Sequence, residues 1–289
     1  MARHPHACAW CEAPLPADAT RAPGGVRCPS CAAVTTDPWP TDAELDAAYE
    51  VFYRPQGGRF SGPGDEILRR TRALPARRID RLAPAGPVLD VGAGEGWLVD
   101  ALRARGRDAI GIERGDDDLL ALEARFAAIV FWHSLEHLRR PGAALAHAAR
   151  LLVPGGLLVI AVPDAASVQA RRFGDRWLHL DPPRHLVHIP RPTLLRTLRE
   201  LGLRVETVGG LRGGQVVFGW LHGLVGTLPG HPDLYDAVRR PAARSRPIGA
   251  GARAGILAAG AALAPVAVVA AGAESVLGRA GTSYVEAVR

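Results

Sequence analysis

Short apolar runs alternate with amphipathic stretches along the chain from residue 85 onward. Runs at 88–91, 108–113, 127–132 and 157–162 predict buried strands. Helical patterns lie between them, over 97–105, from Pro141 to residue 152, and from Pro192 to Gly202. Two further runs, 203–208 and 282–288, predict the last strands. This alternation predicts an α/β fold, with a mostly parallel sheet that carries helices on both faces.

The first 36 residues have another pattern, because they hold all four cysteines of the chain in two C-x-x-C pairs: Cys8, Cys11, Cys28 and Cys31. Four thiolates are a common ligand set for structural zinc, and the metal supplies folding energy that a short, core-poor segment lacks. The pattern predicts a zinc ribbon over 1–36. A redox dithiol and a metal-free relic are the alternatives.

Residues 37–84 are predicted to be a helical linker or cap. Thr41 and Glu44 have the spacing of a capping box, and a second helix is predicted over 67–82. The chain therefore divides into a ribbon (1–36), this linker (37–84) and an α/β domain (85–289).

The α/β domain contains an apolar insertion at 211–277. Residues 254–273 carry no charge over 20 positions, which is long enough to span a bilayer. A spanning helix would, however, pull the last strand away from its sheet. We expect helices that form a lid over an apolar substrate and could touch a membrane peripherally; plain core helices are the alternative.

The composition fits a globular protein, with 48% hydrophobic and 22% charged residues. The net charge of +6 does not indicate nucleic-acid binding, because the chain has no lysine and its arginines are scattered. The start of the chain lacks a signal-peptide pattern, so we expect a cytoplasmic protein whose cysteines bind metal.

A glycine-rich turn carries the main functional signal. The run Asp90-x-Gly92-x-Gly94-x-Gly96 follows the first strand, and Glu113 ends the second. Glycines let a backbone approach a ligand closely, and such an acid accepts hydrogen bonds from ribose hydroxyls. Trp97 stands where a dinucleotide fingerprint has its third glycine, which argues against NAD or FAD. A turn that merely joins strand to helix is the alternative.

This turn resembles the first motif of class I S-adenosylmethionine-dependent methyltransferases. The resemblance implies that Asp90, Gly92, Gly94 and Gly96 hold the methionine and ribose, that Glu113 binds the ribose hydroxyls, and that Asp116 faces the adenine. Only 12 residues separate Glu113 from Phe126, too few for the helix and third strand usual in that family. A sheet without one edge strand, and with only a loop in that place, is therefore predicted.

Residues 37–84 contain the joint Pro38-Trp-Pro40, a Tyr-bearing helix and Arg59-Phe-Ser-Gly62. These features resemble the bacterial zinc-ribbon methyltransferases, and the likeness extends over nearly the whole chain. The resemblance places Tyr49, Tyr53 and Arg59 over the cofactor mouth. An amphipathic helix that simply packs on the domain is the alternative for Tyr49 and Tyr53.

Two histidine-rich segments are candidates for chemistry. His133-x-x-Glu136-His137 has the form of an inverted zinc-protease signature, but it begins where a strand ends and so disfavours that class. It resembles the fourth methyltransferase motif, and a related subset of methyltransferases binds a divalent cation through such a Glu and His, here Glu136 and His137. The second segment is 177–188, in which we favour His185 as the general base, with His133 as the other candidate. An Asp181–Arg184 salt bridge that only pins this loop is the alternative.

The sequence thus predicts an S-adenosylmethionine-dependent methyltransferase with bound Zn²⁺ that acts on a small-molecule, glycan or lipid-linked acceptor. Two other functions stay open: a non-catalytic zinc-ribbon adaptor with a degenerate cofactor domain, and an RNA methyltransferase. Nucleic acid is not the partner that we expect.

Overall fold

The computed structural model describes residues 4–52, 60, 63–113, 116–209 and 214–289. Its centre is a six-stranded sheet in the order β5-β4-β6-β7-β10-β9. The first four of these strands are parallel, and β10 runs antiparallel to both neighbours. The bounds are β4 (Val88–Val91), β5 (Ala109–Ile112), β6 (Phe126–Trp132), β7 (Leu152–Pro163), β9 (Arg204–Gly209) and β10 (Thr282–Val288). The predicted α/β fold is confirmed.

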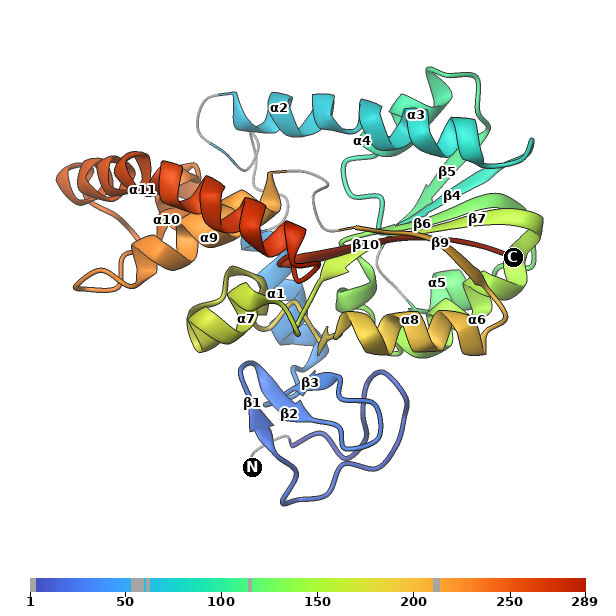
Figure 1. Ribbon diagram of the computed structural model, residues 1–289, viewed down its shortest axis with the longest axis horizontal. Helices are drawn as coiled ribbons and strands as arrows, with labels where there is room; N and C mark the ends of the chain where they lie inside the picture. Colours follow the sequence, from blue (N-terminus) through green and yellow to red (C-terminus); the bar gives the residue numbers. More distant parts are fainter. Residues whose placement is uncertain (1–3, 53–59, 61–62, 114–115, 210–213) are drawn as a thin grey trace.

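Helices cover both faces of the sheet (Figure 1). One face carries α2 (Gly64–Thr71), α3 (Ala73–Leu82) and α4 (Trp97–Arg103), and the other carries α5 (Asp116–Leu120), α6 (Pro141–Leu151) and α8 (Arg191–Glu200). The single helix predicted over 67–82 is two helices, which meet at Arg72. Pro75, at the third position of α3, has no N–H to continue the hydrogen-bond ladder of α2, which accounts for the break.

The sheet ends at β5, so the predicted loss of an edge strand is confirmed for the described residues. The prediction that only a loop remains there was wrong, because the five-residue helix α5 forms. Leu119 explains the helix: it is fully buried in the core between α5, α6 and the sheet. Burial of this one leucine therefore stabilises a helix in a segment that is otherwise rich in aspartate.

The ribbon at the N-terminus is joined to the main domain by a second sheet (Figure 1). It contains β1 (Arg21–Ala22), β2 (Gly25–Arg27), β3 (Val34–Thr36) and β8 (Val187–His188), and β3 pairs antiparallel with β8. Trp10 Nε1 donates to Thr197 Oγ1 of α8 at 3.2 Å. The ribbon therefore shares a core with the domain and directly supports the segment that follows His185.

Helix α1 (Asp42–Phe52) lies between the ribbon and the sheet. Its predicted capping box is confirmed: Thr41 N donates to Glu44 Oε2 at 2.8 Å, and Glu44 N donates to Thr41 Oγ1 at 3.2 Å. Leu45 and Ala48 are buried, so this helix does pack on the domain.

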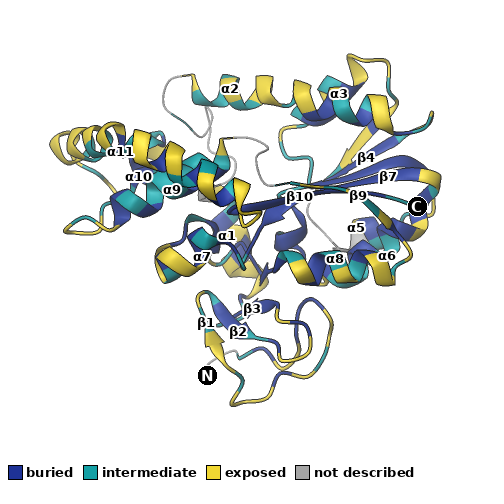
Figure 2. Cartoon of the chain, in the orientation of Figure 1, coloured by how far each residue is buried: buried dark blue, intermediate teal, exposed yellow. Residues whose placement is uncertain are grey.

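The insertion before the last strand forms a helical lobe. It contains α9 (Gln215–Gly226), α10 (Leu234–Val238) and α11 (Ala250–Val276), and it lies beside α7 (Val168–Phe173). Single-turn helices occur at Leu135–His137, Gly174–Arg176, Leu178–Leu180 and Pro241–Ala243. Helix α11 is long and apolar enough to cross a membrane, yet most of its surface is exposed (Figure 2). Strand β10 directly follows it and is fully paired, as the sequence argument required.

Candidate functional site

The glycine-rich turn has the conformation that its sequence requires. Gly92, Gly94 and Gly96 have φ angles of 79°, 59° and 73°, a region that favours glycine. A Cβ on Gly92 would lie 2.4 Å from the Cβ of Ser134. A Cβ on Gly94, in contrast, would meet no protein atom within 4 Å, so the backbone there faces open space.

That open space is a cavity of about 580 Å³ at the carboxyl ends of the parallel strands. It brings together residues from three separate predictions: Gly92 and Gly94, Glu113 at the end of β5, and His133 at the end of β6. Helix α1 and the segment after β6 complete the lining with Asp46, Tyr49, Glu50, Ser134, His137 and Leu138. We call it the glycine-turn cavity. Gly96 does not line it and instead precedes α4.

Asp90 lies beneath this turn, inside β4. Its side chain is 3% exposed, and its Oδ1 atom has no hydrogen-bond partner among the described residues. Burial raises the pKa of Asp90 to about 7; nearby Arg72 opposes this shift and Glu113 adds to it. A buried carboxylate oxygen without a donor fits a cationic ligand group placed at the turn.

Other predicted cofactor contacts have mixed outcomes. Tyr49 lines the glycine-turn cavity, with its hydroxyl 3.1 Å from Nδ1 of His137. Tyr53 and Arg59 lie outside the described residues, as does the side chain of Asp116. Helix α1 thus forms one wall of the cavity. The side chain of the acid that was predicted to face the adenine, Asp116, is not described.

The end of β6 positions the histidine motif. His133 has a φ of 53°, and its backbone N–H donates to Ala161 O at 2.7 Å. This turn points His133 Nδ1 toward Glu136 Oε1, 3.3 Å away. Only Leu135–His137 is helical, so the two histidines do not share a helix face as the protease signature requires.

The segment from residue 177 to 188 folds directly over Glu136. Leu186 N donates to Glu136 O at 2.8 Å, and the rings of His137 and His185 lie 4.6 Å apart. The predicted Asp181–Arg184 ion pair is present. His185 is buried and does not line the glycine-turn cavity. The sequence did not predict that this segment and Glu136 meet, since they are about 50 residues apart.

Burial also determines the protonation of the histidines in this segment. Desolvation, followed by the neighbouring His137, holds the pKa of His185 well below its usual value. Desolvation likewise lowers the pKa of His179 to about 3 and that of His188 to about 4. These imidazoles are therefore neutral at neutral pH.

The four cysteines converge on one point. The Sγ atoms of Cys8 and Cys31 are 3.6 Å apart, those of Cys11 and Cys28 are 3.7 Å apart, and all four lie within 4.8 Å of one another. Ligands at about 2.3 Å around tetrahedral zinc would be roughly 3.8 Å apart. A thiol hydrogen bond from Cys31 lowers the pKa of Cys8 to about 5, and the same bond raises the pKa of Cys31. The cluster thus fits a tetrahedral metal ion in both spacing and chemistry.

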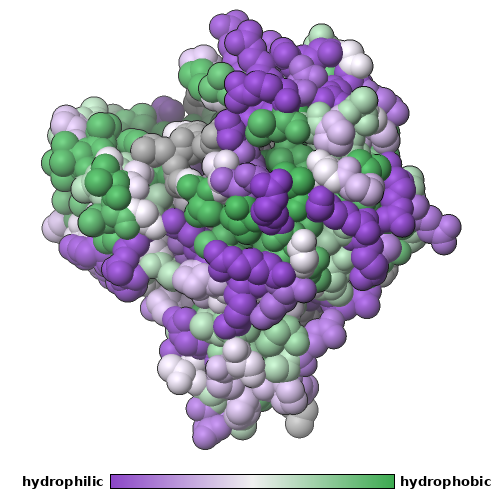
Figure 3. Space-filling view, turned by 45° about the vertical axis from the view of Figure 1, so that its right-hand side comes forward, coloured by the Kyte–Doolittle hydropathy of each residue, from purple (hydrophilic) through white to green (hydrophobic). Residues whose placement is uncertain are grey.

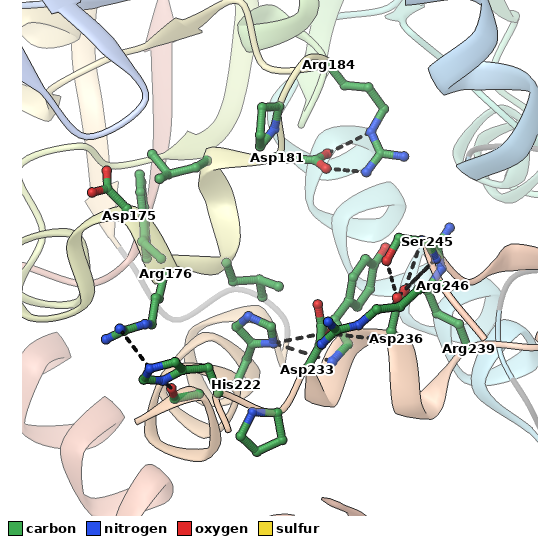
Figure 4. A pocket seen from close by; sticks show the side chains of 18 of the residues that line it. Asp175, Arg176, Asp181, Arg184, His222, Asp233, Asp236, Arg239, Ser245 and Arg246 are labelled. Atoms are coloured by element: carbon green, nitrogen blue, oxygen red, sulfur yellow. Dashed lines mark hydrogen bonds and ion pairs between the residues drawn. The ribbon is translucent and has the colours of Figure 1, made fainter. Parts of the chain in front are cut away.

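A second cavity, of about 450 Å³, lies between the 175–184 segment and the helical lobe (Figure 4). Carboxylates and guanidinium groups line it together: Asp175, Asp181, Asp233, Asp236, Arg176, Arg184, Arg239 and Arg246. His222, on α9, also lines it and lies 3.8 Å from Asp233 Oδ1. We call it the mixed-charge cavity. Helix α1 contributes to both cavities, because Ala48 lines this one and Tyr49 lines the glycine-turn cavity.

Residues 67–208 match a family model described as a methyltransferase domain. This segment, just under half of the chain, is similar to a methyltransferase domain. The match includes the glycine turn, Glu113, the His133 motif and the 177–188 segment, while the ribbon and the helical lobe lie outside it. No curated protein matches the chain.

Two solved structures are similar to this chain. The 4+2 cyclase SpnF is 20% identical with a TM-score of 0.42, and the match covers 83% of this chain and 87% of SpnF. An S-adenosylmethionine-dependent methyltransferase from Archaeoglobus fulgidus is 16% identical with a TM-score of 0.43, and the match covers 75% of this chain and 94% of that protein. We draw no conclusion about function from either likeness.

Proposed function

We propose that this protein is an S-adenosylmethionine-dependent methyltransferase that acts on a small polar or glycan acceptor. The observation that carries the proposal is the glycine-turn cavity, in which open glycine backbone, Glu113 and His133 meet above Asp90, whose Oδ1 has no partner in the described part of the chain. S-adenosylmethionine carries an ammonium, a sulfonium and a ribose. Its positive charge suits Asp90, and its ribose hydroxyls suit Glu113.

When bound, the cofactor supplies a methyl group on a sulfonium that needs no further activation. The residues then have two tasks, which are to align an acceptor with that methyl and to remove a proton. We propose His133 as the base, because it lines the cavity whereas His185 does not. Its Nδ1 lies 3.3 Å from a carboxylate oxygen, which only accepts, so this nitrogen carries the proton and Nε2 keeps the lone pair.

The acceptor would enter from the mixed-charge cavity. Carboxylates and guanidinium groups side by side can hydrogen-bond a molecule with several hydroxyls or with charges of both signs. The lining holds as many carboxylates as guanidinium groups, so it does not have the excess of positive charge that favours a polyanion such as RNA. Figure 4 shows Asp233 and Asp236 on the lobe facing Asp181 and Arg184 across the cavity.

We further propose that Cys8, Cys11, Cys28 and Cys31 hold one Zn²⁺. The spacing of the four sulfur atoms supports this proposal. Two matching turns support it as well: Glu12 and Ala32 each follow a C-x-x-C pair directly and have left-handed backbone, with φ of 60° and 64°. Each turn brings a pair of thiols to one side. Reduced thiols of this kind also fit a cytoplasmic location.

The direct test is isothermal titration of the full chain with S-adenosylmethionine and S-adenosylhomocysteine. We expect both to bind with one site per chain, and Glu113→Ala to weaken binding by about 1–3 kcal/mol through loss of the ribose hydrogen bonds. Glu123→Ala is the matched control, because Glu123 is exposed just before β6, at the opposite ends of the strands.

Absence of binding to either compound would reject the enzyme and favour the adaptor. The observation that supports the adaptor is that the sheet of the described residues ends at β5, without the usual edge strand. Equal affinity of the Glu113 variant and its control would mean that another group binds the ribose.

A further inference from the structure

Glu136 is a buried carboxylate surrounded by three imidazoles. Its side chain is 2% exposed, and its Oε2 atom has no hydrogen-bond partner among the described residues. His133 lies 3.3 Å from its other oxygen, and Nε2 of His185 lies 3.9 Å from that same oxygen, beyond hydrogen-bond reach. Leaving a charged oxygen buried and unpaired is costly, so this arrangement indicates a missing positive partner.

The tautomer of His185 strengthens this point. Its Nδ1 is 2.7 Å from the carbonyl oxygen of His179, and a carbonyl only accepts, so Nδ1 carries the hydrogen. In the neutral ring, Nε2 then presents a lone pair toward Glu136 Oε1 at 3.9 Å and toward Asp181 Oδ2 at 3.7 Å. A lone pair that faces two carboxylates is unfavourable unless a cation lies between them.

His137 is fixed in a similar way. Its Nδ1 lies 2.9 Å from the carbonyl oxygen of Arg184 and 3.1 Å from the Tyr49 hydroxyl; because the carbonyl only accepts while the hydroxyl can also accept, this pair favours the tautomer with the hydrogen on Nδ1. Such a bond from the distal ring nitrogen to a backbone carbonyl is the usual support of a metal-binding histidine. One ligand atom each from Glu136, His137 and His185 lie within 4.8 Å of one another.

We propose that Glu136, His137 and His185 form a second metal site, for a divalent cation of the Mn²⁺, Fe²⁺, Co²⁺ or Zn²⁺ class. One carboxylate and two imidazoles are a ligand set that suits these ions better than Mg²⁺ or Ca²⁺. Because three of the described residues supply ligands, coordination positions remain for other groups. His137 lines the glycine-turn cavity, so these positions are next to it.

The site also gives His185 a role that its burial explains. A general base needs access to the acceptor, whereas a metal ligand needs a neutral ring held in one orientation. If the proposed function holds, the cation would favour acceptors that offer oxygen atoms near the methyl group. The cation-binding property itself is independent of that function.

The test is titration of zinc-loaded full-length protein with Mn²⁺, followed by the electron paramagnetic resonance of free Mn²⁺. Manganese does not displace zinc from four thiolates, so the cysteine cluster does not contribute. We expect one saturable Mn²⁺ per chain, and more than about 100-fold weaker binding in Glu136→Gln and in His185→Ala. His147→Ala, whose ring contacts Leu122 on the far side of α6, should bind as the natural protein does.

Thermal unfolding and S-adenosylhomocysteine titration of the same preparations separate the possible results. The proposal is overturned if folded natural protein shows no saturable Mn²⁺ binding up to millimolar concentration, or if both variants bind as tightly as the control. Manganese binding without S-adenosylhomocysteine binding would leave the metal site standing and reject the proposed function; the reverse result would reject the metal site alone.

Discussion

At the scale of single residues, Asp90 and His133 have opposite relations to the glycine-turn cavity. Asp90 is buried beneath it, with a carboxylate oxygen that no described residue hydrogen-bonds, and His133 lines it with one ring nitrogen directed to Glu136. The first residue is suited to hold positive charge, and the second to take up a proton.

Asp90 makes cofactor affinity and stability depend on pH in opposite directions. Its folded-state pKa of about 7 exceeds the unfolded value of 3.8, so the unfolded chain loses the proton first as pH rises. The free energy of unfolding should therefore fall between pH 4 and 7, by at most about 1.4 kcal/mol per unit. Affinity for S-adenosylmethionine should rise as pH passes through about 7, because the ionised carboxylate attracts the cation.

The variant Asp90→Asn should abolish the pH dependence of both the unfolding free energy and the cofactor affinity. We expect it to be at least as stable as the natural protein at pH 8 and to bind the cofactor weakly at every pH. Denaturant unfolding and calorimetry at pH 5, 6.5 and 8 measure these effects. Asp100→Asn, at an exposed position of α4, is the control. An affinity that does not change with pH in the natural protein would contradict this role.

His133→Ala should lower turnover by about 10²–10⁴ and leave S-adenosylhomocysteine affinity nearly unchanged, because a general base acts on the acceptor and not on the cofactor. Transfer of a labelled methyl group to an acceptor identified by screening measures turnover, and calorimetry measures the S-adenosylhomocysteine affinity. Unchanged turnover would assign the proton to solvent or to another group. A parallel loss of affinity would place His133 in cofactor binding instead.

At the scale of elements, the ribbon and the 185–188 segment form one unit. Strand β3 pairs with β8, Thr36 N donates to Leu186 O at 3.0 Å, and Thr36 Oγ1 donates to His185 O at 2.6 Å. The ribbon has little core of its own, so the zinc ion that we propose for its four cysteines should also hold the backbone of His185 in place.

Removal of the zinc should therefore loosen a segment about 150 residues away in sequence. We expect Cys28→Ser to lose the metal, lower the unfolding temperature, and speed amide hydrogen exchange at 186–189. Ser30→Ala, an exposed position between Cys28 and Cys31, should change none of these. Elemental analysis and exchange mass spectrometry are the measurements. Full exchange protection of β8 without metal would show that the main domain holds this strand unaided.

At the scale of the whole molecule, the helical lobe presents an apolar surface away from the sheet. Val269, Val276 and Leu277 are 73%, 89% and 69% exposed, and hydrophobic residues gather on the left-hand lobe in Figure 3. Arg244, Arg246 and Arg253 lie near the start of α11. An apolar helix beside basic residues is suited to lie on an anionic membrane surface, and we propose this contact for α11.

The protein should float with vesicles of phosphatidylcholine and phosphatidylglycerol in a density gradient, and less so at high salt. The double variant Val266→Glu and Val269→Glu should stay at the bottom. Leu74→Glu is the control, because Leu74 is 70% exposed on α3, on another surface. A natural protein that does not float but forms a dimer, dispersed by the double variant, would assign the surface to a second copy of the chain.

The sequence by itself determined the six strands of the main sheet, the glycine turn with Glu113, and the cysteine cluster. These features depend on local spacing: apolar periodicity, positive φ at glycine and C-x-x-C pairs each act over a few residues. Only the tertiary structure decided that His133 lines the cavity and His185 lies buried on Glu136, since their distance depends on a segment folding back across about 50 residues. The same holds for the pairing of β3 with β8, because contacts between distant segments are set by packing and leave no periodic pattern in either one.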